Sequence, residues 1–271
     1  MFSILFVLIS HTPLFILKAM SFFFYTIATV LKTSHLKITE KNIKHCLGDN
    51  KELVRKSFRE TMELSLIFPF IWGKKDNYKK LIDSDYLQHK TLENERPKIF
   101  FTLHMGCVDI LIYVLSELLT QANFLYTPAK NKTLDRKLLD IRQRKGGKMF
   151  PATPNGVKNL YKSFIDKKNV VIASDLVPHK QGVYEKFFNK ECFCIDLIEK
   201  LSNKGTHDLY FVFLTKGQKN KYKFVCKKIK NKITTSEMNG FFEEAILTAP
   251  ELYSWEYKKF KKPRTNNSNI Y

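Results

Sequence analysis

The sequence predicts an α/β fold, a single domain in which helices flank a central mixed sheet, preceded by an apolar amino-terminal helix. Three observations support this prediction. Short apolar runs alternate with segments of helical periodicity, and no internal repeat or low-complexity block interrupts them. The chain has 271 residues, 44% of them hydrophobic, which is enough to bury the core of one large domain. Its most apolar stretch is residues 1–31.

This amino-terminal stretch has the composition of a membrane anchor. A bilayer core accommodates about 20 apolar residues as a helix, and residues 13–31 nearly supply them. Lys18 lies within the run and must reach the lipid headgroups or face protein. We therefore expect residues 1–31 to form a transmembrane or interfacial helix. A signal peptide fits less well, because no basic segment precedes the run and no small-residue cleavage site follows it. A helix buried in the core is the remaining alternative.

The net charge of +20 comes from 46 Lys and Arg against 26 Asp and Glu. Such an excess predicts an anionic partner, which could be a nucleic acid, an acidic protein or an anionic lipid surface. Nucleic acid is disfavoured, because the Phe residues fall in apolar patterns and do not alternate with Lys. The lysine-rich sequence after Leu31 predicts that the body of the protein lies on the cytoplasmic side of a membrane.

The five cysteines predict free thiols. Their number is odd, Cys192 and Cys194 are separated by one residue, and no histidine cluster accompanies them. Disulfide frameworks usually use even numbers of cysteines, and zinc sites usually show C-x-x-C spacing with further Cys or His ligands. We therefore expect reduced thiols and no zinc site.

The expected elements follow one another as strands and helices after an amphipathic helix at 50–73. Strands are expected at 98–103, 123–126, 148–150, 169–174, 209–214 and 221–226. Helices are expected at 107–120, 132–145, 155–167, 195–203, 235–248 and 250–260. This alternation predicts a sheet covered on both faces. Residues 32–264 are expected to form the domain and 265–271 a carboxyl-terminal tail.

His104 and Asp109 are the first candidate site residues. His104 directly follows an expected strand, and Asp109 lies in the first turn of the next helix. Open α/β sheets place their sites at this edge. Gly106 can supply the sharp turn that brings the carboxylate back to the imidazole, where it would fix the tautomer of a general base. The alternative is an Asp that stabilises a helix amino terminus beside a structural His.

Arg142, Arg144 and Asp175 complete the candidates that the residue pattern indicates. Only seven of the 46 basic residues are arginines, so each is expected where a planar, permanent charge is needed. Arg142 and Arg144 end a basic helix that leads into Gly146 and Gly147, a combination suited to phosphate oxygens, although a solvated helix face is the alternative. Asp175 ends an expected strand, where it is either a site carboxylate or a turn residue.

With these residues identified, the chain resembles the bacterial lipid A biosynthesis acyltransferases, the lauroyl/myristoyl transferase family of the H-x4-D/E glycerolipid acyltransferase superfamily. The resemblance runs nearly from end to end and includes the apolar anchor. It rests on LHMGCVD for the H-x4-D/E motif, on RQRKGGKMFP for an Arg-containing segment, on SDLVPHKQGVYEKFF, on PELYSWEYKKFKKPR and, more weakly, on KITEKNIKHCLG. The segments that begin at Ser174 and Pro250 are long and specific.

The resemblance implies a glycerolipid-acyltransferase-like fold and a place on the cytoplasmic side of the bacterial inner membrane. It implies transfer of an acyl chain from acyl-(acyl carrier protein) to a hydroxyl of an anionic lipid A precursor, without metal or cofactor. His104 is then the base, Asp109 its orienting partner, and Arg142 and Asp175 further catalytic residues. The implied substrate-binding residues are Arg144, Gly106 and Lys148.

Four departures from the family pattern keep other functions open. Thr127 stands where the family commonly has Arg, and Leu176 where Gln or His usually follows the Asp. Asn189 replaces a Gly and Glu256 replaces a His. One alternative is an acyltransferase of the same superfamily that acts on a phospholipid or another glycolipid. The other is a catalytically inactive, membrane-associated binding protein.

Overall fold

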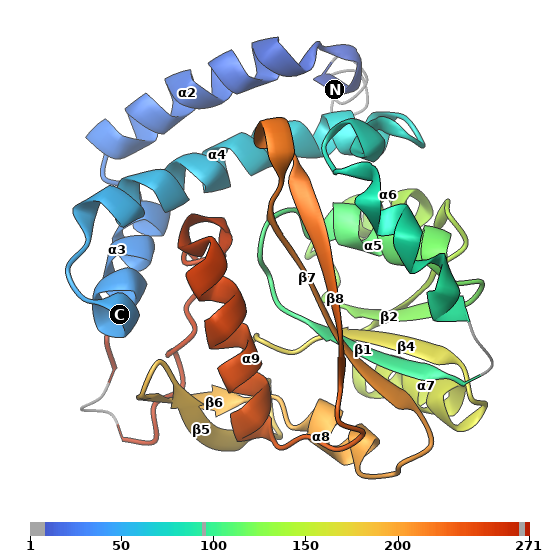
Figure 1. Ribbon diagram of the computed structural model, residues 1–271. Coiled ribbons are helices and arrows are strands. Elements are labelled where there is room, and N and C mark those ends of the chain that lie inside the picture. The colour runs from blue at the N-terminus through green and yellow to red at the C-terminus, as the bar shows by residue number, and fades with distance from the viewer. Residues whose placement is uncertain (1–8, 94–95, 266–268) are drawn as a thin grey trace.

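The computed structural model describes residues 9–93, 96–265 and 269–271 (Figure 1). Its centre is a mixed six-stranded sheet in the order β3-β2-β4-β1-β7-β8, in which only β8 is antiparallel to its neighbour. The strands are β1 (Lys98–Thr102), β2 (Ala122–Tyr126), β3 (Lys148–Pro151), β4 (Asn169–Ala173), β7 (Asp208–Lys216) and β8 (Tyr222–Ile229). The α/β fold with a mixed sheet is therefore confirmed.

Both faces of the sheet are buried, as the unbroken apolar strands predict. Along β1, Ile99 and Phe101 point into one core, and Phe100 points into the other. The first core is closed by α7 (Pro154–Ile165), α8 (Leu197–Ser202) and α9 (Thr235–Thr248), and the second by α5 (Val108–Leu118), with side chains of α6 (Lys132–Gln143) packed against it. This arrangement brings the carboxyl ends of the parallel strands to one edge of the sheet.

The predicted helix over residues 250–260 is wrong. Only a short 3-10 turn, η4 (Pro250–Leu252), lies there. The main chain beyond it bonds to other parts of the molecule, because the nitrogen of Ser254 donates to the carbonyl of His104 at 3.0 Å and Met105 forms a β-bridge with Tyr253. These interactions draw the segment into an extended path along the loop that follows β1.

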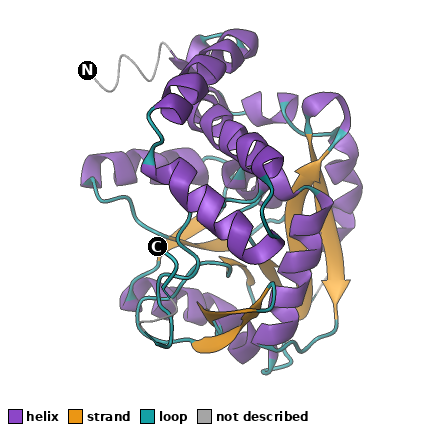
Figure 2. Ribbon diagram, turned by 90° about the vertical axis from the view of Figure 1, so that its left-hand side faces the viewer, coloured by secondary structure: helices purple, strands orange, loops and turns teal. Residues whose placement is uncertain are grey.

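A hairpin and a helix were not expected from the sequence. β5 (Val183–Phe187) and β6 (Lys190–Cys194) form a separate antiparallel hairpin. Their charged residues, such as Glu185 and Lys186, interrupt the apolar runs by which strands were recognised. α3 (Ser34–Leu47) is a helix within a polar segment, and it packs against α4 (Lys51–Gly73), the expected amphipathic helix. Figure 2 shows these helices in front of the sheet.

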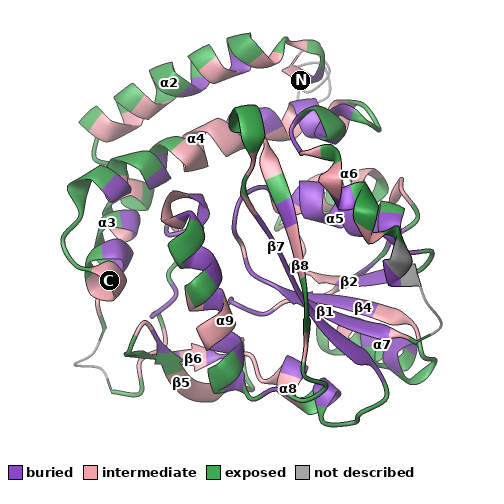
Figure 3. Cartoon of the chain, in the orientation of Figure 1, coloured by how far each residue is buried: buried purple, intermediate pink, exposed green. Residues whose placement is uncertain are grey.

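The amino-terminal helix α2 (Leu14–Val30) lies along α4 (Figure 1). Leu17 and Ser21 are buried against the domain, and Lys18 pairs with Glu63 of α4 at 2.9 Å. Lys18 thus faces protein, one of the two expected possibilities. The other side of α2 is exposed (Figure 3), and its apolar residues include Phe15, Phe22, Phe23 and Val30.

None of the helices that the structure describes is, by itself, long and apolar enough to cross a membrane. Helices α2 and α3 meet the length and hydropathy requirements only together, and they are bent by 80° at the break between them. Residues 1–8 of the expected anchor lie outside the described residues, as do residues 266–268 of the expected tail.

Candidate active site

His104 and Asp175 are brought together by the pairing of β1 with β4. The two strands are parallel, with Thr102 opposite Ala173. The nitrogen of Ser174 donates to the carbonyl of Thr102 at 3.0 Å, which continues the ladder past the last paired residues. His104 lies two residues beyond Thr102, and Asp175 lies two residues beyond Ala173. The two side chains therefore lie side by side at the carboxyl edge of the sheet, where sites of open α/β folds lie.

The two residues make two hydrogen bonds. Nδ1 of His104 lies 2.7 Å from Oδ1 of Asp175, and the main-chain nitrogen of His104 donates to Oδ2 at 3.0 Å. The Asp175 side chain is 2% exposed, whereas that of His104 is 30% exposed. With Nδ1 held by the carboxylate, Nε2 is the ring nitrogen left for proton transfer.

The electrostatics of the pair favour a charged carboxylate and a basic imidazole. Burial lowers the pKa of His104, but the charge of Asp175 and the hydrogen bond to it outweigh burial and raise that pKa above its ordinary value. Burial raises the pKa of Asp175, yet its interactions with His104 bring that pKa below the usual range. A histidine in this setting is suited to act as a general base.

The expected pairing of Asp109 with His104 is wrong, because the structure pairs Asp109 with Arg142. Nε of Arg142 donates to Oδ1 of Asp109 at 2.5 Å, and Nη2 is 3.3 Å from Oδ2. Asp109 is almost fully buried in the first turn of α5, and Arg142 approaches it from the last turn of α6. The buried carboxylate is thereby neutralised by a two-point guanidinium contact. The charge of Arg142 lowers the pKa of His104, so this ion pair adjoins the His104–Asp175 pair.

Gly106 provides the turn between these two pairs, as expected. Its φ of +64° lies in the left-handed region that favours glycine. A Cβ at this position would lie 2.9 Å from the ring of Tyr222, so even a methyl group has no room. Cys107, which follows, is fully buried, and burial raises the pKa of its thiol, which agrees with a packing role.

Arg144 and Lys148 are not brought to this edge of the sheet. The Arg144 guanidinium donates to the carbonyls of Ile71 and Trp72 at the end of α4 and stacks over the ring of Tyr113 at 5.0 Å. Its fork is therefore used to satisfy a helix carboxyl terminus. Lys148 begins β3 at the opposite, amino edge of the sheet. The expected contact of these two side chains with substrate phosphates is thus not supported.

The carboxyl-terminal segment, residues 252–262, contributes two charged residues that sequence reasoning did not select. Lys259 is buried and donates from Nζ to the main-chain carbonyl of Asp175 at 2.6 Å. Glu256 accepts a hydrogen bond from Thr61 at 3.2 Å, and its charge raises the pKa of His104. The sequence feature that points to them is the dense run of Lys and aromatic residues in PELYSWEYKKFKKPR, which is unusual for a solvent-exposed end.

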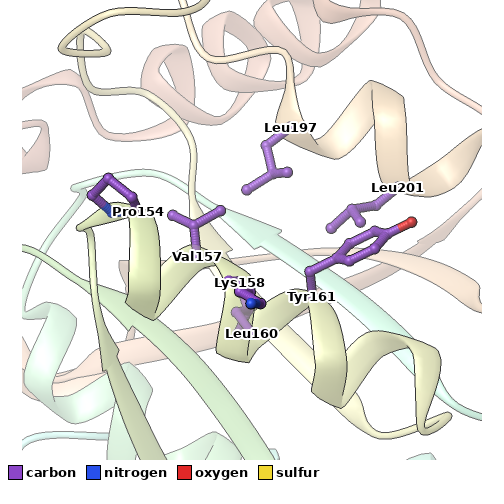
Figure 4. Close-up of a pocket in the computed structure, with 7 residues that line it drawn as sticks. All are labelled: Pro154, Val157, Lys158, Leu160, Tyr161, Leu197 and Leu201. Carbon is purple, nitrogen blue, oxygen red and sulfur yellow. The ribbon is translucent and has the colours of Figure 1, made fainter.

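An apolar pocket of about 300 Å³ lies between α7 and α8 (Figure 4). It is lined by Pro154, Val157, Lys158, Leu160, Tyr161, Leu197 and Leu201. This lining includes none of the four residues in the two ion pairs described above, so the pocket is separate from the candidate active site. Within the described residues, no group of three or more His, Cys, Asp or Glu could hold a metal ion.

The family model for bacterial lipid A biosynthesis acyltransferases matches residues 2–262. Comparison with curated proteins gave no match. The matched range covers both ion pairs, the sheet and the carboxyl-terminal segment. The chain therefore belongs to the family of bacterial lipid A biosynthesis acyltransferases.

Proposed function

We propose that this protein transfers a fatty acyl chain from acyl-(acyl carrier protein) to a free hydroxyl of an already acylated lipid A precursor, with His104 as the general base. The observation that carries the proposal is the His104–Asp175 pair at the carboxyl edge of the sheet. Family membership supplies the reaction class, acyl transfer in lipid A biosynthesis.

The geometry of the pair supports the following reaction. Nε2 of His104 takes the proton of the acceptor hydroxyl as its oxygen attacks the thioester carbonyl carbon. The tetrahedral intermediate then collapses, the carbon–sulfur bond breaks, and the imidazolium returns the proton to the leaving thiolate. The products are an ester and a free thiol, and the histidine ends in its starting form. Asp175 holds the ring and stabilises the imidazolium between the two steps.

Arg142 is the cation best placed to receive the acceptor. Asp109 uses one edge of its guanidinium, through Nε and Nη2, and the side chain is 20% exposed. A guanidinium fixed in this way presents its remaining N–H groups to a phosphate without first losing side-chain freedom. In this assignment Asp109 orients Arg142, not His104.

The exposed side of α2 is the proposed contact with the cytoplasmic face of the inner membrane. Phe15, Phe23 and Val30 are 72%, 61% and 76% exposed, in a chain whose other apolar residues are mostly packed. Because Leu17, Ser21 and the Lys18–Glu63 pair hold the opposite side against the domain, the helix would lie in the interface with this face in the lipid. The net charge of +20 suits both an anionic membrane and an acidic carrier protein.

The test is mass spectrometry of lipid extracts after membranes containing the protein are incubated with acyl-(acyl carrier protein) donors of several lengths and a tetra-acylated glucosamine acceptor. The expected result is a mass gain of one acyl group. His104→Ala should reduce this gain by about 10²–10⁴-fold. His35→Ala, which removes an exposed histidine of α3, is the matched control.

Two other outcomes would contradict the proposal. Newly formed phosphatidic acid, with no gain on the glucosamine lipid, would identify a phospholipid acyltransferase of the same superfamily. No product from any acceptor, with the protein folded and bound to membranes, would identify a binding protein without catalytic activity.

A further inference from the structure

Lys259 is a buried lysine directly behind the His104–Asp175 pair. It is 3% exposed, and its Nζ donates to the main-chain carbonyl of Asp175 at 2.6 Å. The ammonium also lies 5.1 Å from the centroid of the Phe187 ring. Burying an ammonium is costly unless charge and hydrogen bonds compensate it. Part of its compensation here comes from the loop that carries Asp175, so Lys259 and that loop are coupled.

The carboxyl-terminal segment holds the loop after β4 at two further points. The hydroxyl of Tyr257 accepts a hydrogen bond from the nitrogen of Val177 at 2.9 Å. Nζ of Lys262 donates to the carbonyl of Pro178 at 2.7 Å. Together with the bond from Lys259 to Asp175, these contacts fix three positions within four consecutive residues. The carboxyl-terminal segment therefore fixes the backbone that orients the Asp175 carboxylate.

The same segment also fixes the loop that carries His104. The nitrogen of Ser254 donates to the carbonyl of His104 at 3.0 Å, and the nitrogen of Gly106 donates to the carbonyl of Leu252 at 2.8 Å. One continuous stretch thus holds both members of the pair. Of its side chains, Lys259 is the one that brings a positive charge to Asp175.

The charge of Lys259 acts on the ionisation of the pair. Burial lowers the pKa of Lys259, but the negative charge around it, that of Asp175 included, outweighs burial and raises this pKa above the ordinary value, so the side chain stays an ammonium. That ammonium helps to lower the pKa of Asp175. The ionisable groups that face Lys259, Asp175 and His104 from the surrounding elements are Cys46 of α3, Arg142 of α6, Cys192 and Cys194 of β6, and Tyr253, Glu256 and Tyr257 of the carboxyl-terminal segment.

We propose that Lys259 is a positioning residue of the acyl-transfer site, which holds Asp175 in place and keeps the His104–Asp175 pair in the form with a neutral imidazole and an ionised carboxylate. This inference rests on the proposed role of His104 as the base. That form carries one negative charge, and protonation of His104 makes the pair neutral overall. A positive charge beside the pair stabilises the first form relative to the second, and so keeps His104 available as a base near neutral pH.

The test is a titration of His104 by NMR in the full-length, detergent-solubilised protein with 13C-labelled histidine. His104→Ala assigns the signal by its loss. Lys259→Met removes the charge and the hydrogen bond, and Lys259→Gln removes the charge while keeping a donor for the Asp175 carbonyl. Lys258→Met is the matched control, because it removes an exposed lysine one residue away. If the methionine variant does not fold, the glutamine variant answers the same question.

The pKa of His104 is expected to rise by about one pH unit in both Lys259 variants and to stay at the wild-type value in Lys258→Met. In the acyl-transfer assay, kcat should fall about tenfold in Lys259→Gln with KM unchanged, since substrate contacts are kept. An unchanged or lowered pKa in Lys259→Gln overturns the inference, as does an equal rise in Lys258→Met. The titration needs no substrate. A failure of the acyl-transfer proposal would therefore appear as an inactive wild type and would leave this readout intact.

Discussion

Asp175 accepts two hydrogen bonds from His104, one from the ring at 2.7 Å and one from the main chain at 3.0 Å, although the two residues are 71 positions apart. The second bond fixes the carboxylate relative to the backbone that carries the imidazole. Both oxygens of the carboxylate are thereby held, and one of them holds the ring at Nδ1, which is the arrangement expected of a general base whose orientation matters for its reaction.

Acyl-transfer activity should fall as the pH drops through the pKa of His104, which lies above 6.5. Because the folded-state pKa of His104 is raised above the ordinary 6.5, the neutral base is lost as pH falls through that higher value. Asp175→Asn removes the charge that raises it, so the acidic limb of kcat/KM should move to lower pH while kcat falls by about 10²–10³-fold. A pH–rate profile of both proteins tests this. An acidic limb that stays in place in the variant would show that Asp175 does not control His104.

The Asp109–Arg142 pair should behave as one unit in stability. Removing one member leaves the other charge buried and unpaired, so Asp109→Asn and Arg142→Gln are each expected to lower the free energy of unfolding by about 3–5 kcal/mol. The double variant should cost no more than either single one. Urea unfolding of the four proteins in a double-mutant cycle measures the coupling. Additive losses would mean that the two side chains do not depend on each other.

Gly106→Ala should destabilise the protein more than the same change at Gly48. Both glycines have positive φ, +64° and +83°, so each alanine bears the backbone cost of about 1 kcal/mol. A Cβ at Gly48 meets nothing within 4 Å, whereas at Gly106 it meets the Tyr222 ring at 2.9 Å. We expect a total of roughly 3 kcal/mol for Gly106→Ala from thermal or urea unfolding. Equal losses at the two sites would contradict the crowding at Gly106.

Charged substitutions on the outer face of α2 should weaken membrane binding. Phe23→Glu and Val30→Glu each replace an exposed apolar side chain, and each should reduce flotation with phosphatidylethanolamine–phosphatidylglycerol vesicles about tenfold. Leu247→Glu on α9, which is 61% exposed, is the control for surface hydrophobicity elsewhere. Flotation reduced to the same degree by all three variants would show that α2 is not the specific contact.

The sequence predicted the sheet well because its strands are short, apolar and buried on both faces. Phe100 and Phe101 point into different cores, so β1 reads as a continuous hydrophobic run. The β5–β6 hairpin has one exposed side and charged residues, and this weakens the same signal. Residues 253–260 look helical by apolar spacing, but main-chain bonds to the His104 loop outweigh local preference there.

The site could be predicted only in part, because partners were inferred from nearness in sequence. Asp109 is five residues from His104, yet the strand order places β4 beside β1, and so it is Asp175 that reaches the ring. Sequence alone gives no strand order. The scarcity of arginine singles out Arg144, and its half-buried fork does use planar geometry, but for the carbonyls at the end of α4. Lys259 carries no comparable signal, because lysine is abundant in this chain.

The carboxyl-terminal segment, residues 252–262, is synthesised after the loops that it holds. Ribosomes make the chain from its amino end, so α2 and the strands of the sheet emerge well before this segment. Until residue 262 has been synthesised, the loops that carry His104 and Asp175 lack the bonds from Ser254 and Lys259 that set their positions. In the proposed arrangement, α2 is therefore available for membrane contact before the loops that carry His104 and Asp175 are fixed, and membrane contact precedes the onset of activity.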